Sequence, residues 1–295
     1  MYRLKRQTKE NIAGYIFILP YLIGFIIFQG LPFVIAFVLG FTNIKFISRL
    51  EGVGFTGLAN FIRMFGDPET MAALLRSGIY TVLYVPLILV SGFIFALLIN
   101  QKIRLTNLIK TLLFLPYVSN MIAVSVIFKL LLSPDGPIIG FFASLGIDVF
   151  PPLYDLNFAL PTVVVIAVWS GMGLYMITFL AALQGVPSEL LEAAKIDGAG
   201  SVRRVFSVII PVITPTAFFL VISAIITSLQ NFTIIQTFTA GGPGRATTVL
   251  SIQIVRTAFT AYQTGYASAQ AIILFIIVLF ITLIQWKGQK QWVTY

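Results

Sequence analysis

The sequence predicts an all-α, polytopic membrane protein with six transmembrane helices. The chain is 58% hydrophobic and only 10% charged, with a mean hydropathy of +0.98, which is too apolar for a soluble domain of this length. A membrane-spanning helix needs about 20 nearly uncharged residues. Six segments satisfy this requirement: residues 13–39, 79–99, 108–132, 160–183, 208–229 and 267–286.

These segments divide the chain into a cytoplasmic tail (1–12), a first transmembrane helix (13–40), an external loop (41–77), a five-helix core (78–286) that contains a cytoplasmic loop (186–204), and a C-terminal cytoplasmic tail (287–295). A cleavable signal peptide is disfavoured at the N-terminus. The first apolar run is long enough to span a bilayer, and it shows no clear small-residue cleavage site.

The distribution of basic residues predicts the orientation. Most of the 19 Lys and Arg residues lie in the two tails and in the second and fourth loops, and fewer lie in the first, third and fifth loops. Cytoplasmic loops carry the excess of Lys and Arg in membrane proteins. We therefore expect both termini and the loop 186–204 to be cytoplasmic.

The composition also excludes several classes of function. The net charge of +9 comes from basic residues that flank apolar spans, which is typical of topology signals and not of nucleic-acid binding. The chain has no cysteine and no histidine, so disulfides, thiolate metal sites and the commonest general base are excluded. We predict no catalytic residue and no metal site.

Seven prolines lie inside or at the edge of the predicted spans: Pro20, Pro32, Pro86, Pro116, Pro161, Pro211 and Pro215. Each removes a backbone hydrogen bond and can kink its helix. Proline is also generally more frequent in membrane helices than in soluble ones, so both explanations stay open for each position.

The loop 186–204 contains a short polar helix pattern. Pro187 is a helix-initiating residue, Ser188 is the expected N-cap, and Gly198 and Gly200 are the expected stop signals. Leu190, Leu191 and Ala194 share one face of this helix, so it is amphipathic. It either lies in the headgroup region of the bilayer or binds a soluble partner.

The same residues carry a resemblance. Glu192-Ala193-Ala194, followed by Gly198 and then by Pro211, resembles the EAA loop of the membrane subunits of bacterial ABC importers. The resemblance implies the type I ABC importer permease fold, in which this loop forms a coupling helix that docks in a groove of a cytoplasmic ATPase. It assigns the docking surface to Glu192, Ala193, Ala194, Asp197, Gly198 and Ala199.

Two further segments are similar to the carbohydrate-uptake, maltose-type branch of that family: Gly57-Leu58-Ala59-Asn60-Phe61, and Gly241-Gly242-Pro243 with its flanking threonines. The branch implies a binding-protein-dependent sugar importer in the bacterial cell membrane. Its expected partners are a second, non-identical permease subunit, two ATPase subunits and an external sugar-binding protein. The chain has no Walker A pattern, so we expect it to bind no cofactor, with ATP and Mg used by the ATPase partners.

Neutral polar and aromatic residues within the spans predict a substrate path. Amides and hydroxyls match sugar hydroxyls, and aromatic rings stack on sugar rings. The candidates are Tyr117, Asn120, Trp169, Ser170, Gly171, Tyr175, Thr227, Ser228, Gln230 and Asn231. The alternative is that such groups bond between helices. By resemblance, Asn231 corresponds to an asparagine that contacts sugar in maltose-type importers.

Lys129 is the only clear ionisable residue within the predicted spans. It either extends to the outer interface, which we favour, or lies near the path. A stand-alone secondary carrier is disfavoured, because such carriers usually need an intramembrane Asp, Glu or His. An ABC importer permease for another solute, such as glycerol phosphate or an oligopeptide, stays open, although a phosphate favours an Arg or Lys clamp. A membrane-embedded enzyme lacks a reactive constellation.

Overall fold

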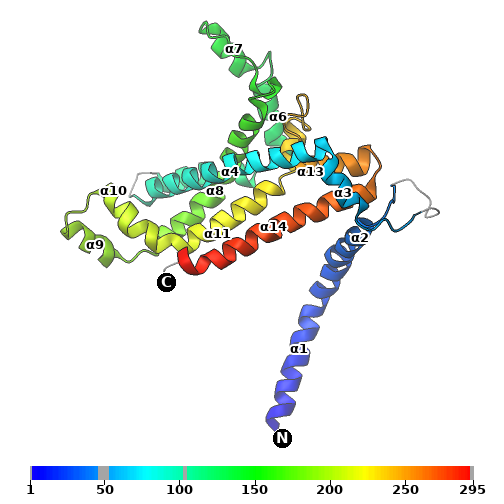
Figure 1. Cartoon of the computed structure of the whole chain (residues 1–295). Helices are drawn as coiled ribbons and strands as arrows, with labels where there is room; N and C mark the ends of the chain where they lie inside the picture. Colours follow the sequence, from blue (N-terminus) through cyan, green and yellow to red (C-terminus); the bar gives the residue numbers. More distant parts are fainter. Residues whose placement is uncertain (1, 46–52, 102–104, 293–295) are drawn as a thin grey trace. The chain divides into compact units, whose positions relative to one another are not determined.

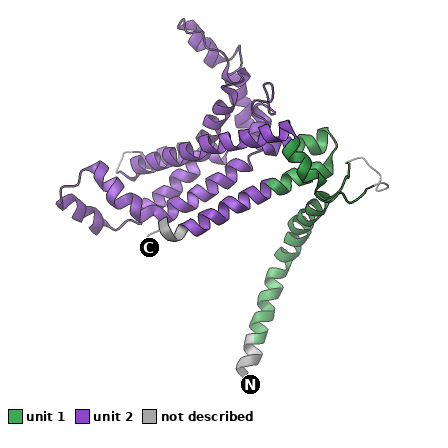
Figure 2. Ribbon diagram, in the orientation of Figure 1, with its two compact units in different colours: residues 1–66, 254–273 green, residues 67–253, 274–295 purple. Residues whose placement is uncertain are grey.

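The computed structural model describes residues 2–45, 53–101 and 105–292. In these ranges the backbone is helical or irregular and forms no named strand, and the isolated bridge between Thr42 and Phe55 is antiparallel. The chain divides into two compact units, Met1–Gly66 with Ile254–Ile273, and Asp67–Gln253 with Leu274–Tyr295 (Figure 2). The predicted all-α class is confirmed.

The first unit begins with the helix α1 (Tyr2–Phe25), the π-helical segment η1 (Ile26–Gly30) and α2 (Leu31–Leu39) (Figure 1). Together they form one apolar span from Thr8 to Leu39. The π-helical turn directly precedes Pro32, which has no amide to donate to the helical ladder. No residue of the most apolar window of this span is buried within the chain, as expected for a helix that faces lipid or another subunit.

The end of α2 is tied to α3 (Ala59–Gly66) by one side chain. The Asn60 amide nitrogen donates to the carbonyl oxygens of Gly40 at 2.9 Å and of Thr42 at 2.8 Å. These carbonyls follow the last turn of α2, where no later helical amide can reach them. The segment 57–61, which resembles the carbohydrate branch, therefore holds the end of the first span in place.

The start of α14 packs against the same turn within this unit. The Gly265 amide donates to the Ile44 carbonyl at 3.0 Å. A Cβ on Gly265 would lie 2.2 Å from the carbonyl oxygen of Thr42, so only glycine fits there. Arg63 of α3 covers the ring of Tyr266, with its guanidinium carbon 4.1 Å from the ring centroid.

The substitution Asn60→Ala is expected to loosen the first span. It leaves two part-buried carbonyls without their donor, at a cost of about 1–3 kcal/mol. Thermal unfolding of the purified chain in detergent should show a lower midpoint. Asn107→Ala is the matched control, because Asn107 is exposed and its side chain has no partner in the described structure. Equal midpoints for the two variants would contradict this role.

The second unit contains the remaining helices. In chain order they are α4 (Pro68–Asn100), α5 (Thr106–Val118), α6 (Met121–Leu131), α7 (Pro137–Ser144), the 3-10 turn η2 (Pro152–Tyr154), α8 (Ala159–Gln184), α9 (Ser188–Ile196), α10 (Ser201–Arg204), the π-helical η3 (Val205–Ile209), α11 (Ile210–Leu229) and α12 (Thr233–Phe238). The helices α13 (Leu250–Val255) and α14 (Thr264–Trp292) have residues in both units, and the π-helical η4 (Arg256–Thr260) between them belongs to the first unit.

Five helices of the described chain are long and apolar enough to cross a membrane: Thr8–Leu39, Pro68–Asn100, Ala159–Gln184, Ser201–Leu229 and Thr264–Gly288. A sixth span is counted if α5 and α6 are taken as one, and these two helices meet at 96°. The third predicted span, 108–132, is therefore not one straight helix but this bent pair. The helix is interrupted where Asn120 caps α6, its side-chain oxygen accepting from the Ile122 amide at 2.9 Å.

The second span begins at Pro68, well before the predicted residue 79. Its start has a capping residue, because the Asp67 carboxylate accepts from the Glu69 amide at 3.0 Å and from the Thr70 hydroxyl at 2.7 Å. Proline at the first helical position is also favourable. The polar first turns of α4 are the part that an apolar scan misses.

The core of this unit lies where α8 packs between α4 and α5. A Cβ on Gly92 of α4 would lie 2.7 Å from the Tyr175 Cβ, and one on Gly173 would lie 2.6 Å from the Leu113 carbonyl oxygen of α5. These glycines let the backbones approach closely, as small residues do in membrane bundles. Two thirds of the apolar window of α8 is buried, so α8 is the central helix of the unit.

Candidate functional site

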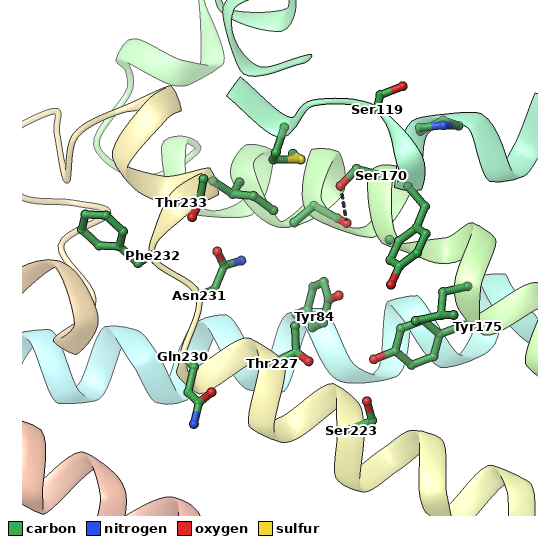
Figure 3. A pocket seen from close by; sticks show the side chains of 17 residues that line it. Tyr84, Ser119, Ser170, Tyr175, Ser223, Thr227, Gln230, Asn231, Phe232 and Thr233 are labelled. Carbon is green, nitrogen blue, oxygen red and sulfur yellow. Dashed lines mark hydrogen bonds between the residues drawn. The ribbon is translucent and has the colours of Figure 1, made fainter. Parts of the chain in front are cut away.

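A cavity of about 490 Å³ opens among α4, α5, α6, α8 and the end of α11 (Figure 3). We call it the Asn231 cavity. Its polar lining consists of tyrosine, serine, threonine and amide side chains: Tyr84, Tyr117, Ser119, Ser170, Tyr175, Ser223, Thr227, Gln230, Asn231 and Thr233. No lining residue is charged. Such a surface can form neutral hydrogen bonds and ring contacts with a ligand.

Seven of the ten residues predicted for the substrate path line this cavity: Tyr117, Ser170, Gly171, Tyr175, Thr227, Gln230 and Asn231. They come from three spans that are far apart in the sequence. Figure 3 shows the side chains of Thr227, Asn231 and Tyr175 around one space.

The other three predicted residues do not line the cavity. Ser228 is buried and bonds to the Thr81 hydroxyl at 2.9 Å, so it joins two helices. Trp169 packs edge-on against Phe128, with ring centroids 5.1 Å apart. Asn120 caps α6. Ser228 therefore forms a bond between helices, which is the alternative to a place on the substrate path.

Asn231 is held by bonds from two directions. Its amide nitrogen donates to the Tyr80 hydroxyl at 2.6 Å, and its backbone carbonyl accepts from the Ser251 hydroxyl at 2.7 Å. The ring of Tyr80 stacks on Tyr84, with centroids 5.7 Å apart. One N–H of the amide is thus engaged, and the amide oxygen, which is its only acceptor, can accept from a ligand hydroxyl.

Four polar residues of the cavity were not among the candidates from the sequence: Tyr84, Ser119, Ser223 and Thr233. Tyr80 and Tyr84 are spaced four apart in an apolar span, a spacing that places both on one helix face. That pair of hydroxyl-bearing rings was the available signal. Ser223 has no comparable signal, since a single serine in a span is common.

The bend between α5 and α6 contributes the cavity wall formed by Pro116, Tyr117, Ser119 and Met121. A straight helix over 108–132 would keep its backbone groups in the helical ladder. The bend instead directs the end of one helix and the start of the next toward the cavity, where irregular backbone is tolerated at membrane depth.

The polar helix predicted after Pro187 is α9. It begins at Ser188, and the residue in the cap position is Pro187, without a side-chain bond. The prediction that Ser188 is the N-cap is therefore wrong, because Ser188 is the first helical residue and Pro187 precedes it in the cap position. The predicted stop is confirmed. Gly198 has a φ of +77°, and the Ala199 amide donates to the Ala194 carbonyl at 2.9 Å.

No residue of α9 is buried within the chain. Of the predicted apolar face, Leu191 and Ala194 are half-buried but Leu190 is 46% exposed, and Glu192, Ala193 and Lys195 are exposed too, so the predicted amphipathic pattern is followed in part. Ala199 is half-buried, and Asp197 and Gly198 are exposed. Glu192 and Asp197 form no ion pair with another described residue. The six predicted docking residues thus form a surface that is largely free in the chain by itself.

A continuous helical segment joins this surface to the Asn231 cavity. From Ser201 to Leu229, α10, η3 and α11 form one span, and Thr227 and Asn231 lie at its far end. The π-helical turn η3 lies just before Pro211, as η1 lies before Pro32. At 1.5 Å per residue the segment is about 40 Å long.

Among the described residues, no group of three or more Asp or Glu side chains could hold a metal ion.

Residues 70–286 match the family described as binding-protein-dependent transport system inner membrane component. Over its whole length the chain is 35% identical to the probable ABC transporter permease protein YesP of Bacillus subtilis, of which it covers 96%. It is also 35% identical to the sn-glycerol-3-phosphate transport system permease protein UgpA of Yersinia enterocolitica, with 82% of each chain covered.

The fold is similar to that of a chain in the crystal structure of a bacterial alginate ABC transporter in complex with an alginate pentasaccharide-bound periplasmic protein. The TM-score is 0.86 at 23% identity, with 98% of each chain covered. This likeness supports the fold, including the type I permease architecture. With its apolar helices and its matched core, the chain belongs to the inner membrane components of binding-protein-dependent transport systems, the multi-pass permease subunits of ABC importers.

Proposed function

We propose that the chain is the permease subunit of an ATP-driven importer whose substrate is a mono- or oligosaccharide. The observation that carries the proposal is the lining of the Asn231 cavity, which combines amides, hydroxyls and tyrosine rings with no charged side chain. Sugar hydroxyls both donate and accept hydrogen bonds, and the apolar face of a sugar ring packs on aromatic rings. The cavity volume is within the usual range for small-ligand sites.

The working complex that we propose has a second, non-identical permease subunit, two ATPase subunits and an external sugar-binding protein. The alginate transporter supports the last of these, since its crystal structure contains a periplasmic protein with bound pentasaccharide. We assign ATPase docking to α9 and to Asp197, Gly198 and Ala199. ATP and Mg belong to the ATPase partners, and this chain has no catalytic role.

In this proposal, closure of the ATPases displaces α9, and the segment 201–229 transmits the displacement to the Asn231 cavity. The cavity then changes between outward and inward access as the ATPases bind and hydrolyse ATP. A coupled system of this kind has two global states and two distinct sites that bias them.

A second candidate substrate is glycerol phosphate, because a relative at 35% identity is named for its transport. A dianionic phosphate is usually held by Arg or Lys side chains, and the Asn231 cavity has none. We therefore rank a carbohydrate first. A stand-alone carrier is disfavoured by the family to which the chain belongs.

The substitution Asn231→Ala should reduce uptake and substrate-stimulated ATPase activity in the assembled transporter. It removes the amide oxygen that accepts from a sugar hydroxyl, and a site built to bond a hydroxyl loses about 1–3 kcal/mol when its partner is removed. Uptake of radiolabelled sugar by proteoliposomes gives the measurement.

Tyr80→Phe is the matched control. It removes the same 2.6 Å bond to the Asn231 amide nitrogen but leaves the amide oxygen in place. If Asn231 serves the substrate, Asn231→Ala impairs transport much more than Tyr80→Phe does. Equal effects of the two variants would assign Asn231 to helix packing alone.

A further inference from the structure

A second cavity, of about 180 Å³, lies at the other end of α12. We call it the Lys129 cavity. Its lining includes Lys129 at the end of α6, Tyr154 of η2, Phe238 of α12, and Thr239 and Gly242 from the segment that follows α12. The loops that contribute to it are those predicted to be external. None of its residues was among the candidates for the substrate path.

The Lys129 cavity differs from the Asn231 cavity in charge. Lys129 is the cation that the sequence places within the predicted spans, and in the described part of the chain it has no carboxylate partner. No acidic side chain lines the cavity, and Tyr154, whose side chain carries a hydroxyl donor, is among the lining residues. Lys129 is exposed, and apolar side chains of Leu153, Phe238 and Pro243 line the cavity beside it. A cation without a counter-ion beside low-dielectric walls attracts an anionic group more strongly than one in open water.

Three aromatic rings connect the linings of the two cavities. Phe128 packs edge-on against Trp169 at 5.1 Å between centroids and lies 6.5 Å from Phe238. Trp169 directly precedes Ser170 of the Asn231 cavity, and Phe238 itself lines the Lys129 cavity.

The positions along two helices place this aromatic contact between the cavities. On α12, Thr233 and Ile234 line the Asn231 cavity, and Phe238 lines the Lys129 cavity about one turn later. On α6, Met121 lines the first cavity, and Lys129 lines the second about two turns later. The rings of Phe128, Trp169 and Phe238 therefore lie between the parts of α6 and α12 that line the two cavities.

We propose that the Lys129 cavity is a second substrate site that holds an anionic group, a carboxylate or a phosphate, while the aromatic contact separates it from the Asn231 cavity. This inference rests on the proposed function and narrows its substrate class to acidic sugars or sugar phosphates. In this proposal Lys129 binds the anionic group of the substrate, and Asn231 binds its hydroxyls. The neutral lining of the Asn231 cavity is then compatible with a charged substrate.

Trp169 offers a direct reporter, since the chain has three tryptophans. In a variant with Trp286→Phe and Trp292→Phe, Trp169 is the single tryptophan, and it contacts Phe128 beside Lys129. The full chain in phosphatidylcholine nanodiscs is titrated with glucuronate, glycerol 3-phosphate and glucose. We expect the Trp169 emission to change saturably with glucuronate, with glycerol 3-phosphate or with both, and to change less with glucose at the same concentrations.

Lys129→Gln is expected to raise the half-saturating concentration of the anion at least about tenfold, as for the loss of a charge-assisted bond, and Lys129→Arg should keep it near the original value. The carboxylate and phosphate arms show which anionic group is preferred. An equal response to glucose, or a Lys129→Gln variant that titrates unchanged, would overturn the proposal. A response that disappears in phosphatidylglycerol nanodiscs would assign the cavity to a lipid headgroup and overturn it as well.

Two separate assays keep the two proposals apart. Asn231→Ala is read only in the uptake assay, whereas Asn107→Ala, at an exposed position that lines neither cavity, is the control that should leave the Trp169 titration unchanged. If uptake fails to depend on Asn231 while the titration still depends on Lys129, the proposed role of the Asn231 cavity fails and the anion site stands. If uptake depends on Asn231 while the titration does not depend on Lys129, the proposed anion site fails and the proposed role of the Asn231 cavity stands.

Discussion

The substitution Gly198→Val is expected to reduce substrate-stimulated ATPase activity and uptake about 5- to 150-fold, the usual span of a coupling free energy. Gly198 has a φ of +77°, a conformation that costs a β-branched residue about 1–3 kcal/mol. To relieve it, the backbone must change at the turn where the Gly198 amide donates to the Lys195 carbonyl at 3.1 Å. The surface formed by Glu192 to Asp197 is then presented to the ATPase in another orientation.

Gly146→Val is the matched control for this prediction. Gly146 also has a positive φ, +74°, and in both glycines an added Cβ meets nothing within 4 Å. The two variants therefore share the same backbone cost and the same lack of steric conflict. Gly146 follows α7 in a loop predicted to be external, so Gly146→Val should leave the coupling between ATP hydrolysis and uptake intact. The proteoliposome assay needs ATPase activity and uptake measured on the same preparation, and full coupling in Gly198→Val would refute the docking role of this turn.

The substitution Gly173→Val should destabilise the second unit and lower the yield of assembled transporter. A Cβ at this position would lie 2.6 Å from the Leu113 carbonyl oxygen and 2.8 Å from the Phe114 Cα. Both are backbone atoms of α5, so no side chain can rotate away to make room. Overpacking of this kind typically costs about 1–3 kcal/mol, and here it forces α5 and α8 apart beside the Asn231 cavity.

The measurement is the thermal midpoint of the purified chain in detergent, together with the amount of chain recovered from membranes. Gly78→Val is the control within the same unit, since Gly78 is exposed on α4 and an added Cβ there meets nothing within 4 Å. Exposed substitutions of this kind are usually within about 0.5 kcal/mol. A midpoint for Gly173→Val as high as that for Gly78→Val would contradict the close packing of α5 and α8.

The membrane-spanning helices of this chain could be predicted from sequence because each needs a long uncharged run, and segments outside the membrane rarely contain such a run. The break between α5 and α6 could not, since the residues around Asn120 are apolar enough on average to pass the same test. Pro116 indicated a possible kink, but a proline alone does not determine a 96° bend. The bend results from the capping of α6 by Asn120 together with tertiary packing.

The candidate cavity was predicted in part for a similar reason. A sequence shows which polar residues a span contains, and Asn231, Thr227 and Tyr175 are unusual enough there to be noticed. It does not show which way each side chain points. Ser228 and Asn231 are three residues apart at the end of one helix, yet the first bonds to Thr81 and the second lines the cavity. The Lys129 cavity was not predicted, because it forms from three segments that meet only in the fold.

The bend between α5 and α6 has a consequence for how strongly a substrate is held. Backbone groups at the end of α5 and the start of α6 have no continuing helical ladder, and at membrane depth such groups are tolerated where they border protein or a water-filled cavity. In the proposed function water therefore occupies this cavity before the substrate arrives, and each sugar hydroxyl exchanges one set of hydrogen bonds for another. Such an exchange yields only about 0.5–1.5 kcal/mol per bond. Modest affinity in the membrane lets the cargo leave on the far side.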